Sequence, residues 1–150
     1  MSESAMFAGG PANRSMPDAA VMPVLLYPDV PAAAQWLCQA FGFAERLRIG
    51  SHRVQLQVGD GAIVVAQAAR PDLAPAGFGH SVMVRVRDAH RHCAAARAAG
   101  AVIIGEPTDQ PYGERQYSAL DPAGHAWTFS QSLRDVDPAS WGGELVSAAS

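Results

Sequence analysis

Lysine is absent from the sequence, and the eleven positively charged residues are arginines scattered along the chain. With a formal net charge of −3 and an isoelectric point near 5.9, the chain offers no concentrated basic face. Nucleic acids and anionic membrane surfaces need such a face for a broad electrostatic hold. We therefore expect neither nucleic acid nor a membrane among the partners.

Cysteine is also scarce, and long apolar runs are missing. The two cysteines, Cys38 and Cys93, fall far apart in predicted helices, where small buried thiols are the expected state in a reducing compartment. The sequence has no apolar run long enough for a signal peptide or a membrane span. A serine-histidine-aspartate spacing, a nucleophile elbow, a P-loop and a dinucleotide fingerprint are all missing. These absences predict a cytoplasmic protein without those chemistries.

The size and the distribution of apolar residues predict one compact domain. The 150 residues are 49% hydrophobic, which is enough for a single core. Residues 1–18 contain few core-forming residues and are expected to be a disordered N-terminal tail, and residues 136–150 a C-terminal tail. Between them, residues 70–79 carry two prolines and two glycines without periodicity. This stretch is the predicted linker between two halves, residues 19–69 and 80–135.

The two halves repeat one pattern of a strand, a helix and three strands. In the first half we expect strand 21–27, helix 30–41 and strands 44–50, 52–59 and 61–68; in the second, strand 80–88, helix 89–100 and strands 101–105, 115–120 and 125–131. The predicted helix caps Asp29 and Asp88 lie 59 positions apart, and the turn residues Asp60 and Asp121 lie 61 apart. Such a constant offset indicates an internal repeat and predicts an α+β fold of two β-α-β-β-β modules.

Several motifs in this order resemble a known family. The resemblance rests on Tyr27-Pro28-Asp29, Phe41-Gly42-Phe43, the helix from Asp88 to Gly100, Pro111 to Arg115 and Asp121 to His125. Over roughly residues 20 to 135 the chain resembles the glyoxalase/bleomycin resistance protein/dioxygenase (vicinal oxygen chelate) superfamily, in its metal-poor glyoxalase-like branch. The resemblance implies curled mixed sheets around a cavity and a homodimer that shares or swaps modules.

The resemblance also implies where a divalent metal would be bound. Metal-dependent relatives use histidine, glutamate or glutamine in the first and last strand of each module. The matching positions here are Met22, Ser81, Thr128 and the stretch 63–66, which supply no carboxylate. A shift by one residue would bring in His80, and Gln67 could serve in the first module, but Mg²⁺ or Mn²⁺ would be held weakly by such a set. We expect no metal and no other cofactor.

Candidate ligand-binding residues gather in the second half. Arg115 and Tyr117 are two apart on a predicted strand, so they share a face; this face either lines the cavity or carries an exposed cross-strand pair. Tyr112 and Glu114 lie on the preceding loop, where they could close over a ligand. His80 opens a strand and either enters the cavity or bonds to backbone. The predicted ligand site consists of His80, Tyr112, Glu114, Arg115, Tyr117 and Thr128.

The remaining histidines and one tryptophan are given structural roles. His90, His92 and Cys93 are spaced too closely on a helix to converge on one metal, and we expect the two histidines on the surface. His125 is expected to serve the turn after Gly124. Trp141 lies in a polar tail, where docking on a partner subunit would explain it.

Three functions remain open at this point. The leading hypothesis is a protein that binds a small organic molecule in a sheet-lined cavity without metal, as in sequestration of a drug or natural product. The alternative is an enzyme of the same superfamily, a lyase, isomerase or dioxygenase, that either uses shifted metal ligands or works by acid-base chemistry without metal. A non-catalytic regulatory module is the third. Fold alone does not decide among them.

Overall fold

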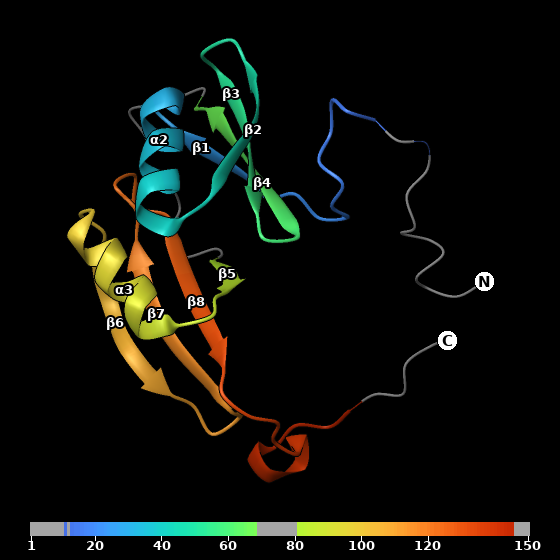
Figure 1. The fold of residues 1–150 in the computed structure, drawn as a ribbon, viewed down its shortest axis with the longest axis vertical. Helices are drawn as coiled ribbons and strands as arrows, with labels where there is room; N and C mark the ends of the chain where they lie inside the picture. Colours follow the sequence, from blue (N-terminus) through green and yellow to red (C-terminus); the bar gives the residue numbers. More distant parts are fainter. Residues whose placement is uncertain (1–10, 12, 69–80, 146–150) are drawn as a thin grey trace.

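The computed structural model describes residues 11, 13–68 and 81–145 and shows two similar modules (Figure 1). Module one contains β1 (Val24–Tyr27), α2 (Val30–Phe41), β2 (Ala44–Ile49), β3 (Arg53–Val58) and β4 (Gly61–Gln67). Module two contains β5 (Val82–Arg85), α3 (Ala89–Ala98), β6 (Val102–Asp109), β7 (Glu114–Leu120) and β8 (Ala126–Ser132), and a short turn, η1 (Pro138–Trp141), follows. The predicted α+β class and the repeat of β-α-β-β-β units are confirmed. The predicted linker 70–79 lies outside the described residues.

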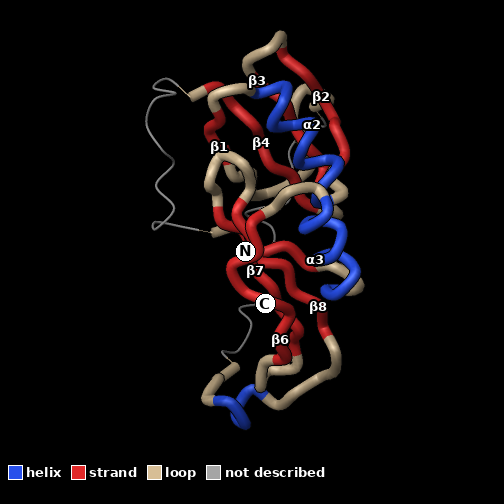
Figure 2. Tube along the Cα trace, turned by 90° about the vertical axis from the view of Figure 1, so that its left-hand side faces the viewer, coloured by secondary structure: helices blue, strands red, loops and turns tan. Residues whose placement is uncertain are grey.

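Each module forms one mixed, four-stranded sheet. Sheet A has the strand order β1-β4-β3-β2, and sheet B has the matching order β5-β8-β7-β6. In both, the first strand of the module pairs in parallel with the last strand, and the remaining pairs are antiparallel. The two modules follow one another along the long axis of the molecule, and α2 and α3 lie next to each other in both views (Figures 1 and 2). Neither sheet closes on itself.

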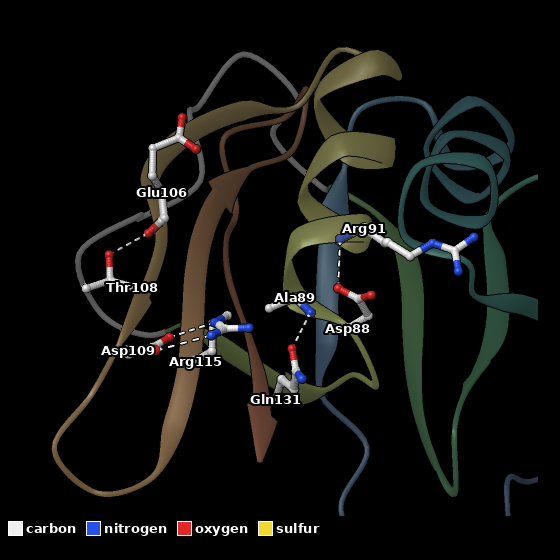
Figure 3. A network of polar contacts seen from close by, with 8 residues as sticks. All are labelled: Asp88, Ala89, Arg91, Glu106, Thr108, Asp109, Arg115 and Gln131. Carbon is white, nitrogen blue, oxygen red and sulfur yellow. Dashed lines mark hydrogen bonds and ion pairs between the residues drawn. The ribbon is translucent and has the colours of Figure 1, made fainter. Parts of the chain in front are cut away.

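The helix boundaries follow from the capping residues that the sequence offers. The carboxylate of Asp29 accepts a hydrogen bond from the backbone N–H of Ala32, and Asp88 accepts one from Arg91, both at 3.1 Å (Figure 3 shows the second). These bonds satisfy N–H groups that have no partner within the first turn. Gly42 ends α2 in the left-handed region, at φ 82°.

A single aromatic core joins the helices to both sheets. Phe41, the last residue of α2, lies at its centre, with ring centroids 5.4 Å from Trp127 and 4.8 Å from Phe129. Both β8 residues are fully buried. We call the side of each sheet that packs on α2 and α3 the helix face, and the opposite side the open face. Because the modules meet through their helix faces, the open faces are left for other contacts.

A buried carboxylate links the two modules. Asp121, in the turn before β8, accepts hydrogen bonds from the hydroxyl of Tyr27 at 2.6 Å and from the indole N–H of Trp127 at 3.1 Å. The backbone N–H of His125 donates a third, and the His125 ring contacts the carbonyl of Leu26 at 2.8 Å. Burial and the neighbouring Asp121 raise the pKa of Tyr27, so its hydroxyl stays a donor. The turn role expected for His125 is thereby explained.

The structure extends one strand beyond its predicted limits. Residues 106–109 were expected in a turn-rich loop, but β6 continues to Asp109. The pairing of β6 with β7 shifts register between Gly105 and Thr108, on either side of Pro107. Proline is tolerated at such a bulge on an edge strand, because no ladder hydrogen bond is lost there. The composition of this stretch therefore indicated a loop where an irregular edge strand forms.

Residues 13–18, which the sequence places in the N-terminal tail, contact module one. The guanidinium of Arg46 donates to the carbonyl of Arg14 at 3.0 Å, and the amide of Gln55 donates to the carbonyl of Ser15 at 2.9 Å. Pro17 is buried. The low apolar content of this segment gave no sign of these contacts, because backbone carbonyls and one proline make them. Among the described residues, no helix is long and apolar enough to cross a membrane.

Replacing Tyr27 with phenylalanine is expected to destabilise the fold. Tyr27→Phe removes the hydroxyl that donates to the buried Asp121. A buried carboxylate that loses a hydrogen-bond donor lowers the free energy of unfolding by about 1–3 kcal/mol. Urea unfolding followed by circular dichroism would measure the change. Tyr112→Phe is the matched control, because its hydroxyl bonds to a half-exposed partner and its loss should cost less than about 1 kcal/mol. Equal losses in the two variants would contradict a special role of the Asp121 contact.

Candidate functional site

The open face of sheet B carries polar side chains that are bonded to one another. Residues at alternate positions of a strand share a face, so the polar residues of β7 and β8 gather on this side while Trp127 and Phe129 point to the core. The amide of Gln116 donates to the hydroxyl of Ser130 at 3.1 Å, and Ser130 donates to Glu114 at 2.7 Å. One row along, the hydroxyls of Ser118 and Thr128 lie 2.9 Å apart. The result is a continuous surface of hydroxyl and amide groups.

Glu114 adds one negative charge at the end of this surface. Hydrogen bonds from Ser132 and Ser130 lower the pKa of the Glu114 carboxyl; burial opposes them with a smaller effect, and the Arg85 guanidinium contributes a still smaller lowering. Arg85, on the edge strand β5, donates to the hydroxyl of Ser132 at 2.9 Å. The carboxylate is therefore ionised near neutral pH and suits a fixed hydrogen-bond acceptor better than a proton donor.

Two aromatic side chains stand at the rim of the same face. The hydroxyl of Tyr112 donates to the side-chain carbonyl of Gln116 at 2.9 Å, which places the tyrosine over the polar surface. The ring of Trp141 lies 5.0 Å from that of Tyr112 and is 45% exposed. The segment that brings Trp141 here passes so close to Gly113 that a Cβ on this glycine would lie 2.6 Å from the carbonyl oxygen of Arg134. Glycine at 113 is thus required for the aromatic rim.

A cleft adjoins this face where the two modules meet. It has a volume of about 270 Å³ and lies between the β3–β4 turn, at Asp60, and strand β5, including Met83 and Arg85. A wider groove of about 650 Å³ lies elsewhere, between α2 and the β2–β3 hairpin. Charge in that groove is neutralised by the ion pair of Glu45 and Arg48 at 2.6 Å. Polar groups that converge on one place indicate a binding site better than the volume of a groove does. This criterion favours the open face of sheet B over the wider groove.

Three of the predicted ligand-binding residues lie together and two lie elsewhere. Tyr112, Glu114 and Thr128 are all on or over the open face of sheet B. Arg115 and Tyr117 share a face, as expected, but it is the helix face. His80 lies outside the described residues. The predicted set therefore includes residues from both faces of β7 and from the open face of β8.

Arg115 is occupied by an ion pair on the edge of sheet B. Its guanidinium donates to both carboxylate oxygens of Asp109 on β6, with the shorter contact at 2.6 Å (Figure 3). The hydrogen bond from Arg115 lowers the pKa of the Asp109 carboxyl. The Arg115 side chain is thus engaged with the neighbouring strand, on the opposite side of the sheet from Glu114 and Gln116.

Tyr117 is part of the core, and it contacts a histidine that was expected on the surface. The hydroxyl of Tyr117 lies 2.5 Å from Nδ1 of His92, and Nε2 of His92 lies 2.9 Å from the carbonyl of Phe41. Because a carbonyl only accepts, Nε2 carries the proton, and Nδ1 accepts from Tyr117. Burial lowers the pKa of His92 despite its backbone hydrogen bond. The surface prediction is wrong for the half-buried His92, whereas His90 is exposed and Cys93 is buried as expected.

Sequence reasoning missed five residues of the polar surface. These are Arg85, Gln116, Ser118, Ser130 and Ser132. The alternation of residues 114–118 and 126–132 contains part of the signal, because positions 114, 116 and 118 are polar and positions 126, 128, 130 and 132 are small or polar. Register between β7 and β8 was needed to join the two strands into one surface.

The described residues do not fit a divalent metal. Across residues 13–68 and 81–145, no group of three histidine, cysteine, aspartate or glutamate side chains lies close enough to hold an ion. At the expected positions, Thr128 bonds to Ser118, and the amide of Gln67 donates to the carbonyl of Pro28 at 2.8 Å. We derive no chemical step that passes through a metal at this face.

Comparison with known proteins gives a consistent family assignment. The model of the Glyoxalase/Bleomycin resistance protein/Dioxygenase superfamily matches residues 20–129. The crystal structure of TioX from Micromonospora sp. ML1 is 33% identical, with a TM-score of 0.62 over 75% of this chain and 97% of its own. A glyoxalase/bleomycin resistance protein/dioxygenase family enzyme from Burkholderia phytofirmans PsJN has a TM-score of 0.65 over the same shares, but at 22% identity it shows the fold alone. No curated protein matches significantly.

The half-buried His92 is expected to make stability depend on pH. Its pKa is lower in the folded than in the unfolded chain, so below about pH 6.5 the unfolded chain binds more protons. The stabilisation is therefore present above this pH and is lost as the pH falls toward the folded-state pKa. Wild-type and His92→Gln proteins, unfolded in urea between about pH 8 and pH 5.5, should differ less at the acidic end. The exposed His90→Gln control should leave the wild-type slope unchanged, and an equal effect of both substitutions would refute this assignment.

Proposed function

Because the chain belongs to the Glyoxalase/Bleomycin resistance protein/Dioxygenase superfamily, we propose that it binds a small organic molecule on the open face of sheet B. The observation that carries this proposal is the mutually bonded polar surface of Gln116, Ser118, Thr128 and Ser130, bounded by the aromatic rim of Tyr112 and Trp141. Preorganised polar groups beside exposed aromatic rings favour a ligand with both kinds of surface.

The chemistry of the face defines the class of ligand. Hydroxyl and amide groups both donate and accept hydrogen bonds, so they match the amide, hydroxyl and carbonyl groups of a largely uncharged molecule. The rings of Tyr112 and Trp141 would stack on a flat aromatic portion. Arg85 and Glu114 supply one fixed donor and one fixed acceptor at the end of the surface. A natural product or drug that carries an aromatic ring and several amides has this combination.

Binding without turnover is the role that we propose, with sequestration of the ligand as its purpose. Glu114 is held ionised, and the other groups of the face are neutral hydroxyls and amides that serve as bonding partners. Acid-base catalysis would require a group poised to exchange a proton near neutral pH. The described face supports recognition more directly than it supports a proton transfer.

We further propose that the active form is a homodimer. Each open face is wide and only one side of a cavity, so a second wall is needed to enclose a ligand. Apolar side chains remain exposed at these faces, with Met83 at 63% and Leu26 at 50%. A second copy that covers them would bury apolar area and supply the missing wall.

Ligand binding is expected to depend on the polar surface and on the rim. A thermal-shift screen of aromatic, amide-containing natural products and antibiotics should find compounds that raise the Tm. For such a compound, Gln116→Ala and Trp141→Ala should each weaken the Kd, measured calorimetrically, by about tenfold. Gln35→Ala, an exposed glutamine on α2, is the matched control and should leave the Kd unchanged. If neither substitution changed the Kd of a bound compound, the ligand site would lie elsewhere on the protein.

Binding is also expected to be independent of metal. Protein purified without chelators should contain far less than one equivalent of divalent metal by elemental analysis, because the described residues of the open face supply no converging set of ligands. Added Mn²⁺, Ni²⁺ or Zn²⁺ should leave the Tm unchanged, since only an ion bound to the folded state would raise it. Stoichiometric metal together with a concentration-dependent rise in Tm would favour the enzyme alternative.

A further inference from the structure

The open face of sheet A differs from that of sheet B, because a segment of the chain lies across it. We call residues 13–18 the leader. In Figure 1 the chain leading into β1 runs on the side of β4 that faces away from α2. All five central residues of β4, Ala62 to Ala66, are buried, so both faces of this strand are covered. Gln55, whose side chain lies on the open face, is only 3% exposed.

Two side chains hold the leader through its backbone. Arg46 donates to the carbonyl of Arg14, and Gln55 donates to that of Ser15, so consecutive peptide carbonyls are bound. The same two side chains are bonded to each other, with Arg46 donating to Gln55 at 2.6 Å. This bond orients the Gln55 amide so that its N–H group points at the leader. A prearranged pair loses less freedom when a peptide binds.

The leader's own conformation completes the fit. The side chain of Asn13 accepts from the backbone N–H of Ser15 at 3.0 Å, and the N–H of Met16 donates to the carbonyl of Asn13 at 3.1 Å. This turn frees the carbonyls of Arg14 and Ser15 to face the sheet. Pro17 then enters the covered region and is buried, while Met16 and Asp18 on either side are exposed. Carbonyl contacts and a buried proline are features of peptide recognition rather than of chain entry into a strand.

The leader lies outside the residues that the family model matches. That match begins at residue 20. The binding pair Arg46 and Gln55, in contrast, lies within the matched region. The family model therefore includes the residues that hold the leader but does not include the leader itself.

We propose that the open face of sheet A is a peptide-binding surface, built on Arg46 and Gln55, and that its occupant is the chain's own leader. The leader closes the wall that module one would contribute to a ligand cavity, so it must leave before a ligand or a second copy uses that wall. This consequence for ligand access depends on the proposed function. The peptide-binding surface itself does not, and the experiments below use no small-molecule ligand.

Limited trypsin digestion of the full chain measures whether the leader is docked. Arg14 is the only trypsin site before Arg46, and its carbonyl, at the bond to be cleaved, is the one that Arg46 holds. Cleavage reports the population in which the segment is released. Gln55→Ala should accelerate the release of residues 1–14, measured by mass spectrometry, by about fivefold. Pro17→Asp acts on the leader alone and should accelerate it by about tenfold or more, because a charge replaces a buried apolar ring.

Matched controls separate docking from general loosening. Gln57 is two residues from Gln55 on the same face of β3, but its amide donates to the carbonyl of Gly59 and not to the leader. Trypsin should release residues 1–14 from the Gln57→Ala variant and from the variant with the exposed Asp18→Ala at the wild-type rate. The Tm of each variant would identify any loss of folding. If both Gln55→Ala and Pro17→Asp were cleaved after Arg14 at the wild-type rate, the proposal that the leader is docked would be overturned.

A synthetic peptide of residues 11–20 tests recognition directly. In the Pro17→Asp protein the surface is intact and its occupant is weakened, so the added wild-type peptide should shift the NMR amide signals of Arg46 and Gln55 saturably. The wild-type protein should respond much less, because its tethered leader competes at an effective concentration on the order of 1 mM. A peptide of scrambled sequence should bind neither protein. Absence of shifts in the Pro17→Asp protein, or equal shifts from the scrambled peptide, would overturn a peptide-binding surface.

Discussion

The carboxylate of Asp121 determines how the two modules meet. A buried carboxylate is tolerated only when donors surround it, and here they come from both modules. Tyr27 ends β1 of module one, whereas Trp127 belongs to β8 of module two, and both donate to the same side chain. The turn that contains Asp121 also supplies backbone N–H groups. Fixing this turn against β1 holds the helix faces together around Phe41 and leaves both open faces directed away from the shared core.

The repeat conserves spacing while the two copies serve different purposes. Asp60 occupies the turn of module one that corresponds to the turn of Asp121, yet Asp60 is exposed and Asp121 is buried. The open faces diverge in the same way. Where module one has the buried Val64, module two has Thr128, which bonds to Ser118. On sheet A, Arg46 and Gln55 bind the leader, whereas on sheet B the hydroxyl and amide groups bond to one another.

Local features of the fold could be predicted from the sequence, and long-range ones could not. The caps Asp29 and Asp88 and the alternation of the strands act over a few residues, so they can be read directly from the sequence. The bond between Tyr27 and Asp121 joins residues 94 positions apart and has no local signal. For a related reason, the sequence did not decide on which face of the sheet the Tyr117 side chain lies. Period-two alternation shows that Arg115 and Tyr117 share a side, but only the position of His92 on α3 decides that this side is the core.

The segments outside the family match reach the two open faces in different ways. Before residue 20, the leader contacts Arg46 and Gln55 on sheet A, and after residue 129, the chain passes Gly113 and places Trp141 against Tyr112 beside sheet B. A shared fold constrains the strands that these segments cover, because those strands also build the core. Terminal segments are free of that constraint, since they can change without disturbing the helix faces. Differences in what members of such a family bind can therefore arise from short additions that cover one wall or extend another, while the sheets that carry those walls stay the same.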